Sequence, residues 1–223
     1  NSGRDLQYSG SCRGGQTATV SFVGDILVHR AIYESVVKGS KSFSQIWSRT
    51  DFMIQKADFS VASLEGPAAL GVDSRGRDVG DVGFIYDGTV YSGTNFVFNF
   101  HPRILTNLKQ SGYDLVSFAN NHSLDRFSIG VDKTLAAARD VGLLTTGARI
   151  AQEHNASFAT VSNIKGINVA FVGCTESLNG RSDNKNQILN CFNGQTEKII
   201  SELAQNSRVD FIVVLPHWGE EYK

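Results

Sequence analysis

The sequence predicts an α/β fold in which a mixed or parallel β-sheet is layered between helices. Short apolar runs that suit buried strands alternate along the chain with segments whose apolar residues recur at helical spacing. Several of the apolar runs also end abruptly at polar residues. Because ligands bind at the carboxyl ends of strands in open α/β sheets, this second pattern predicts a functional site at one edge of the sheet.

Length and composition narrow the class of protein. The chain has 223 residues, of which 41% are hydrophobic and 19% are charged, which is enough for one well-buried domain and short for two. The formal net charge is −1 and basic runs are absent, so the sequence indicates neither nucleic acid nor an anionic membrane surface as a partner. No apolar stretch reaches the roughly 20 residues that span a bilayer.

The chain begins with a polar, glycine-rich segment. We expect residues 1–16 to be loosely held and residues 17–223 to form the domain. Cys12 in the first segment fits either a tether beside a lipid-anchored cysteine or a disordered tail. The run ATVSFVGD, which starts at Ala18, then predicts a short strand that ends in the carboxylate of Asp25.

Two helices and a second strand are expected next. Helices are predicted over residues 31–37 and 43–57, where apolar residues recur at roughly helical spacing. The strand Phe59–Leu64 follows, and it too ends in an acid, Glu65. Two consecutive strands therefore deliver carboxylates to their carboxyl ends.

The middle of the chain combines an irregular segment with a strand and a helix. Residues 66–95 carry many glycines and few large apolar side chains, which predicts an excursion over the surface with a hairpin around Ile85–Tyr91. Phe96–Phe100 is a further apolar run. A helix is predicted over Arg103–Ser111, with Gly112 as its stop.

The whole chain is organised around the stretch DLVSFANNHSLD, residues 114–125. Its apolar run suits a buried strand, and Asn120, Asn121 and His122 would then lie at the carboxyl end of that strand. Residues 123–139 return to helical spacing, with a stop at Gly142. The polar cluster is therefore expected on a strand-to-helix loop, from which side chains reach a cleft.

The last third of the chain repeats the alternation of strands and helices. The elements predicted there are a short strand at Leu143–Thr145, a hairpin of residues 157–162 with 167–172, a helix over Glu197–Gln205 and the very apolar strand Val209–Leu215. His217 follows that last strand after a proline.

Four strand ends thus carry polar side chains to one edge: Asp25, Glu65, Asn121 with His122, and His217. Carboxylate, amide oxygen and neutral imidazole suit Mn, Fe or Zn, and a carboxylate can bridge two ions in two-metal hydrolytic sites. Each residue also has a purely structural interpretation. An acid at a strand end can cap the next helix, asparagines form turns, and a histidine beside a tryptophan can simply pack.

Two of the three cysteines, Cys174 and Cys191, flank a polar loop. A disulfide closing a loop of this length would stabilise the fold by roughly 3 kcal/mol in the chain-entropy model, provided that the compartment is oxidising. Two unpaired buried thiols are the alternative that the residues leave open.

Five motifs in order resemble a known family. The segments SFVGDILVHR, SLEGP, DLVSFANNHSLDRFSIGVDKTL, GLLTTGA and VVLPHWGEEY resemble the capsule synthesis protein family typified by the poly-γ-glutamate protein CapA, which is similar to the calcineurin-like metallophosphatases. The resemblance runs from about Thr17 to the last residue. It implies a layered α/β/β/α metallophosphatase-like sandwich with mixed β-sheets flanked by helices. The segment between the two cysteines also resembles the cysteine-bounded loop of exported Gram-negative members, which implies a Cys174–Cys191 disulfide.

The resemblance also implies a role for each site residue. Asp25 would bind one divalent metal ion, Glu65 would bridge, and Asn121 and His217 would bind a second ion, which makes a dinuclear Mn, Fe or Zn site in the complete protein. His122 would contact the scissile group instead of a metal ion, as a proton donor or a stabiliser of developing charge. Asp125 would orient His122.

Two departures from the family pattern lead to further expectations. The phosphatase pattern has a histidine where this chain has Leu27, and His29 is the nearest imidazole. The family pattern also continues beyond Lys223 to a histidine-rich motif. We therefore expect a further C-terminal segment or a second chain to complete the sheet beside Val209–Leu215, and we expect the 223-residue chain to bind at most one ion, weakly.

The resemblance implies an exported metal-dependent hydrolase that acts on a phosphoester or on an amide of a cell-envelope polymer. The expected location is the periplasm or the cell surface, with the N-terminal region as a membrane tether. The alternative is a non-catalytic component that holds or routes an anionic polymer within an envelope complex for poly-γ-glutamate synthesis or export. The expected partners are a polymer or phosphoester substrate and that complex, with no nucleic acid.

Overall fold

A computed structural model describes residue 15 and residues 17–94 and 96–219 of the protein. The N-terminal segment predicted to be loose therefore lies outside the described residues, apart from Gly15, and so do Cys12 and the chain end at Lys223. Within the described part, every helix is too short or too polar to cross a membrane.

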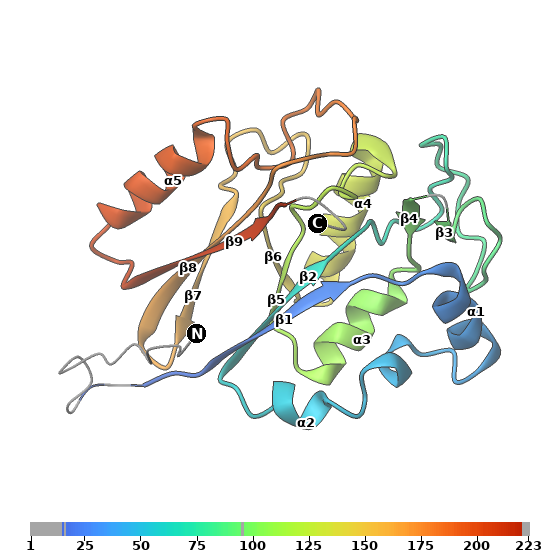
Figure 1. Ribbon diagram of the computed structural model, residues 1–223, viewed down its shortest axis with the longest axis horizontal. Coiled ribbons are helices and arrows are strands. Elements are labelled where there is room, and N and C mark those ends of the chain that lie inside the picture. The colour runs from blue at the N-terminus through green and yellow to red at the C-terminus, as the bar shows by residue number, and fades with distance from the viewer. Residues whose placement is uncertain (1–14, 16, 95, 220–223) are drawn as a thin grey trace, which may run out of the picture.

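Two β-sheets form the centre of the molecule (Figure 1). The strands are β1 (Val20–Ile26), β2 (Phe59–Leu64), β3 (Ser92–Thr94), β4 (Val97–Asn99), β5 (Leu115–Ser117), β6 (Leu144–Thr146), β7 (Ala159–Ile164), β8 (Ile167–Thr175) and β9 (Phe211–His217). The first sheet is parallel throughout, in the order β1-β2-β5-β6. The second has the order β7-β8-β9, with an antiparallel and a parallel pair. Strands β3 and β4 form a separate antiparallel hairpin.

Helices cover the outer face of each sheet. They are α1 (Arg30–Lys38), α2 (Asp51–Ile54), α3 (Arg103–Ser111), α4 (Phe127–Asp140) and α5 (Gln195–Ala204), with a 3₁₀ turn, η1, at Phe43–Ile46. Figure 1 shows α2, α3 and α4 against the first sheet and α5 on the far side of the second. The order of layers is helix, sheet, sheet, helix, which confirms the predicted layered α/β/β/α sandwich. Of the two sheets, only the second is mixed.

The apolar core follows from the alternation of side chains along each strand. Phe59, Val61 and Leu115 point from the first sheet toward the second, where they meet Val169 and Phe171. The rings of Phe59 and Phe171 stack with their centroids 5.1 Å apart. The residues between these positions face the helices and join a larger cluster, which includes Ala62, Leu64, Val116, Leu105 and Leu135.

The helix predicted over residues 43–57 is wrong, because the segment is broken into η1 and the four-residue α2. The indole nitrogen of Trp47 donates to Ser111 Oγ at 2.8 Å, which pins the chain to α3 between the two pieces. Phe52 and Met53 in α2 are exposed. A tertiary contact has overridden local periodicity here.

The hairpin predicted around Ile85–Tyr91 is also wrong, since the pairing lies further along, between β3 and β4. The carboxylate of Asp87 accepts hydrogen bonds from the backbone N–H groups of Thr89, Val90 and Tyr91, at 2.8 to 3.0 Å. Because these donors are satisfied by one side chain, the segment forms a capped turn without strand pairing.

Helix α4 begins at Phe127, four residues later than predicted. The chain first makes tight turns in which Ser123 Oγ donates to the carbonyl groups of Phe118 and Asn120, at 2.8 and 2.7 Å. Local side-chain hydrogen bonds of this kind compete with the helix. Because the helix starts late, Asn120, Asn121 and His122 lie in a structured loop that follows the end of β5.

A buried arginine fastens the 66–95 excursion to this loop. Arg126 is fully buried, and its guanidinium donates to the carbonyl groups of Val72 and Val90 and, at 2.6 Å, to Ser92 Oγ. Burial lowers the pKa of Arg126 to about 10. The glycine-rich excursion is therefore held through its carbonyl groups.

The outer strands β1 and β9 of the two sheets line a slot of about 370 Å³, together with residues of β2 and β5. Among the described residues, β9 has a neighbouring strand on one side only, as we expected for Val209–Leu215. Apolar side chains are exposed on these two strands: Phe22, Val23, Phe211 and Val214.

Candidate metal centre and cleft

Three of the predicted site residues meet at the carboxyl ends of their strands. His217 Nδ1 lies 3.7 Å from Asp25 Oδ1, and His217 Nε2 lies 3.6 Å from Glu65 Oε1. One ligand atom from each of the three residues can be chosen so that all lie within 4.8 Å of one another. The Asp25 side chain is 44% exposed and that of Glu65 only 11%, so the cluster reaches from solvent into the protein.

Local backbone structure brings the two acids together. The pairing of β1 with β2 shifts by one residue between Phe22 and Asp25, and such a β-bulge re-aims the side chain that follows it. The backbone N–H of Glu65 donates to the Ile26 carbonyl at 3.2 Å. Gly66 has φ of 137°, and a Cβ there would lie 3.1 Å from Phe98, so only glycine lets the chain turn away after Glu65.

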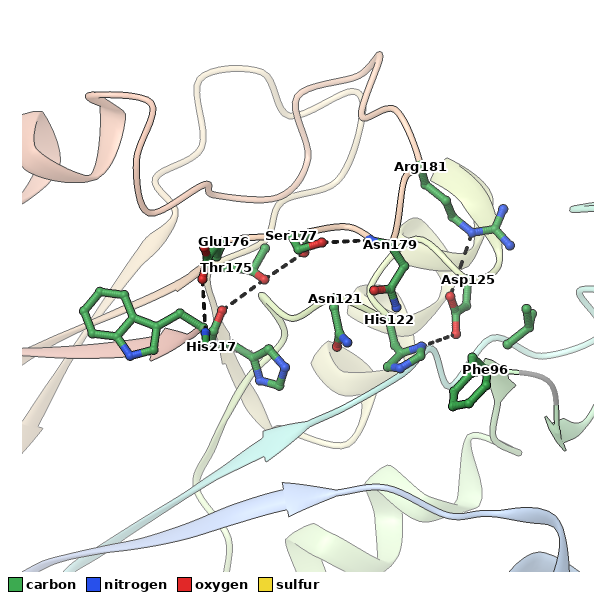
Figure 2. Close-up of a pocket in the computed structure, with 13 residues that line it drawn as sticks. Phe96, Asn121, His122, Asp125, Thr175, Glu176, Ser177, Asn179, Arg181 and His217 are labelled. Atoms are coloured by element: carbon green, nitrogen blue, oxygen red, sulfur yellow. Dashed lines mark hydrogen bonds and ion pairs between the residues drawn. The ribbon is translucent and has the colours of Figure 1, made fainter. Parts of the chain in front are cut away.

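Asn121 adds an amide oxygen to the same end of the cleft. Figure 2 shows the Asn121 amide and the His217 imidazole pointing into the same part of the cleft. Asn121 Oδ1 is buried and accepts no hydrogen bond from the described residues. Because a buried acceptor without a partner is unfavourable, this oxygen fits the role of a metal ligand. Two carboxylates, an imidazole and an amide oxygen match the donor set of Mn, Fe or Zn.

Asn120, the preceding residue, has a structural role. Asn120 is buried, and its amide nitrogen donates to the Leu64 carbonyl at 2.7 Å. Its amide oxygen accepts the backbone N–H of His122 at 3.0 Å. Asn120 thus joins the end of β2 to the loop after β5, which places Asn121 and His122 beside Glu65.

His122 and Asp125 form a buried pair in the same cleft. His122 Nδ1 and Asp125 Oδ2 are 2.8 Å apart, and both side chains are at most 5% exposed. Asp125 Oδ2 also accepts the Phe98 backbone N–H at 2.7 Å, and the Phe98 ring packs edge-on against the imidazole with the centroids 4.6 Å apart. These contacts fix the imidazole and leave Nε2 as the nitrogen available to a molecule in the cleft.

The cleft has a volume of about 860 Å³, and its far wall is a loop closed by a disulfide. Cys174 and Cys191 are bonded, as predicted. The loop contributes Glu176, Ser177, Asn179 and Arg181 to the cleft (Figure 2). Sequence reasoning missed these residues, because a polar loop without periodicity gives no signal of which side chains face inward.

The chain departs from the phosphatase pattern at Leu27, and neither Leu27 nor the nearest imidazole, His29, joins the metal cluster. Leu27 is partly buried against the apolar core. His29 precedes α1 and is exposed, and its ring packs edge-on against Phe98 with the centroids 5.1 Å apart. Within the described residues, a single cluster of acidic and histidine side chains has metal-binding spacing.

Comparison with known proteins assigns the chain to a family. The family described as "Bacterial capsule synthesis protein PGA_cap" matches residues 19–223. The chain is similar to the "Capsule biosynthesis protein CapA" of Bacillus anthracis, with 21% identity over 220 residues, which covers 94% of this chain and 48% of the relative. It is also similar to the "PGA biosynthesis protein CapA" of Bacillus subtilis (strain 168), with 22% identity over 205 residues, which covers 92% of this chain and 50% of the relative. The chain therefore spans about half the length of the curated relatives it matches.

Proposed function

Because the chain belongs to the bacterial capsule synthesis protein family PGA_cap, we propose that it is a metal-dependent hydrolase that acts on a phosphoester or an amide of a cell-envelope polymer. The observation that carries the proposal is the meeting of Asp25 and Glu65 with His217, which lines a cleft that also holds a buried histidine–carboxylate pair. The names of the relatives, which refer to capsule and PGA biosynthesis, direct the proposal to a capsule polymer.

The proposed metal ligands are Asp25, Glu65, Asn121 and His217, with Glu65 as the bridging residue if two ions bind. Divalent metal ions would supply Lewis-acid polarisation of the scissile group and an activated water. The protein supplies a partly buried set of oxygen and nitrogen donors, and Glu65 is the least exposed of the three that cluster. Burial strengthens the attraction of these donors for a cation.

His122 is proposed to give a proton to the leaving oxygen or nitrogen. Its Nδ1 is occupied by Asp125, so the proton would be transferred from Nε2. Asp125 is the positioning residue, because its carboxylate holds the orientation of the imidazole. The Phe98 N–H keeps that carboxylate in place.

We also propose that the protein is exported to the periplasm or the cell surface. The Cys174–Cys191 disulfide supports this location, because disulfides persist in oxidising compartments. The exposed apolar side chains of β1 and β9 support a further proposal, that another polypeptide segment or a second chain of a capsule-synthesis complex covers these edges.

A non-catalytic polymer-binding role is the second candidate. Phe96 and Trp218 line the cleft with 69% and 61% of their surface exposed, and exposed aromatic rings at a cleft are typical of binding surfaces. In this case the same cleft would hold an anionic polymer during synthesis or export without cleaving it.

A turnover assay separates the two candidates. Phosphodiester and γ-glutamyl substrates are incubated with the wild type and with Glu65→Gln in the presence of Mn²⁺, and polymer binding is measured in parallel. Metal-dependent turnover that is lost in the variant supports the hydrolase. Polymer binding without metal-dependent turnover on either substrate favours the binding role.

A further inference from the structure

Arg181 is a charged residue in the cleft that the proposed catalytic machinery does not use. It lies in the disulfide-closed loop and lines the cleft, with 26% of its side chain exposed. Figure 2 shows it above Asp125, on the side of the cleft away from His217. A cation in this position faces the space that a substrate touching His122 would occupy.

The hydrogen-bonding groups of this guanidinium are not consumed by the protein. Arg181 Nε forms an ion pair with Asp125 Oδ1 at 3.8 Å, a distance that is too long for a hydrogen bond. Asp125 is meanwhile engaged by His122 and by the Phe98 N–H. Among the described residues, no oxygen accepts a hydrogen bond from the Arg181 side chain, whose planar fork carries five N–H donors.

Other arginines that stack on aromatic rings are bound differently. Arg149 lies over the Phe158 ring, but its Nε donates to the Asn186 carbonyl at 2.9 Å. Arg103 lies over Phe84, and its guanidinium donates to the Lys41 carbonyl, also at 2.9 Å. These two side chains fasten loops through carbonyl groups, whereas the Arg181 guanidinium has no such acceptor among the described residues.

The ring beneath Arg181 is held in an unusual conformation. The guanidinium lies 4.7 Å from the centroid of Phe127, whose backbone has φ of 57°. Left-handed backbone at a bulky residue is unfavourable and occurs where the surrounding structure enforces it, often at functional sites. Gly76 makes room for the ring, because a Cβ there would lie 2.5 Å from Phe127. The platform for Arg181 is therefore built by two distant segments.

We propose that Arg181 forms an anion subsite, which binds a carboxylate or phosphate group of the substrate next to His122. A guanidinium fork matches the two oxygens of either group in a bidentate arrangement. The loop that carries it is braced by the disulfide and by Asp183, whose carboxylate accepts the N–H groups of Gln187 and Ile188. Little ordering is then needed on binding. The inference rests on the proposed function for the identity of the cleft, and it adds the charge of the substrate.

The test measures binding in the presence of a chelator, so that it does not depend on turnover. The probes are a γ-linked glutamate oligomer, the same oligomer with its free carboxyl groups converted to amides, and a phosphodiester oligomer of equal length. They are titrated into the wild type, Arg181→Gln, Arg181→Lys and Arg149→Gln. Arg149→Gln is the matched control, because it removes an arginine that braces the same loop from outside the cleft.

We expect the wild type to bind at least one anionic probe more tightly than the amide probe. Arg181→Gln should weaken that binding roughly 10- to 100-fold, Arg181→Lys less, and Arg149→Gln little. The anionic probe that loses affinity identifies carboxylate or phosphate as the recognised group. Equal loss in the Arg181 and Arg149 variants, no preference for anionic probes, or no binding by the wild type would overturn the subsite. Turnover with an unchanged KM in Arg181→Gln would overturn the subsite while leaving the hydrolase proposal intact.

Discussion

The two ends of the cleft differ in how their polar groups are satisfied. At the His122 end, the Asp125 carboxylate takes a histidine nitrogen and a backbone N–H, and both side chains are buried. At the His217 end, the carboxylates of Asp25 and Glu65 approach the imidazole at 3.7 and 3.6 Å, and the Asn121 oxygen lacks a donor among the described residues. The Asp125 carboxylate thus has its partners within the protein. The His217 end gathers acceptors and negative charge, an arrangement that a cation stabilises.

The largest expected effect comes from separating the two ends by mutation. His122→Ala should lower any hydrolytic rate roughly 10²- to 10⁴-fold, because a general acid is lost, while metal content stays near that of the wild type. Asn121→Ala should instead lower metal affinity. Turnover and metal analysis on both purified variants check the division of roles. If His122→Ala loses its metal as Asn121→Ala does, the two ends are not distinct.

Substitution of Arg126 tests whether contacts within the protein hold the His122 end of the cleft in place. Arg126→Met leaves the acceptors Val72, Val90 and Ser92 without their buried donor, so it should lower the free energy of unfolding by about 2–4 kcal/mol. Denaturant unfolding in a chelator measures it. The control is Arg139→Met, which breaks an exposed pair with Glu153 and should cost under about 1 kcal/mol. Equal losses in both variants would refute the anchoring role of Arg126.

The residues that sequence reasoning placed correctly share a physical property. Asp25, Glu65 and His217 each lie at or just after the end of an apolar run, and parallel strands bring such ends to one edge of the sandwich. At these positions the pattern of each single strand predicts the same place that the folded sheets give the residue, so the strand pattern was enough to locate the cluster.

Errors arose where a distant contact decides local structure. The Trp47–Ser111 hydrogen bond breaks a segment whose periodicity is helical. No sequence pattern identified Arg181 as a cleft residue, because its position depends on a disulfide-closed loop and on the Phe127 ring from another element. Such contacts are invisible until the chain is folded.

The exposed edge strand β9 should have a smaller and concentration-dependent effect. Phe211 on β9 is 63% exposed, and its burial against another chain would favour association. Phe211→Lys should weaken self-association by roughly tenfold, as measured by analytical ultracentrifugation. Val161→Lys, on β7 at the opposite edge of the same sheet, is the control. A wild type that stays monomeric at all concentrations would contradict the prediction.

The smallest expected effect concerns acid stability away from the cleft. Hydrogen bonds from Lys165 and Thr19 lower the pKa of Asp58 to about 2. A carboxylate with a lowered pKa stabilises the fold above its unfolded pKa of roughly 3.9, and that contribution is lost as the pH falls toward 2. Lys165→Gln should therefore reduce the pH dependence of the melting temperature between about pH 4 and 2. Lys198→Gln, at an exposed helix pair, should not change it. The same slope in both variants would exclude Asp58 as a source.

Metal titration of the 223-residue chain tests the central claim most directly. Mn²⁺ is added to the wild type, Glu65→Gln and His122→Ala, and bound ions are counted by isothermal titration calorimetry with thermal unfolding in parallel. We predict at most one weakly bound ion, because the described residues hold one acidic cluster, with binding lost in Glu65→Gln and kept in His122→Ala. Two tightly bound ions per monomer, or unchanged binding in Glu65→Gln, would contradict the account.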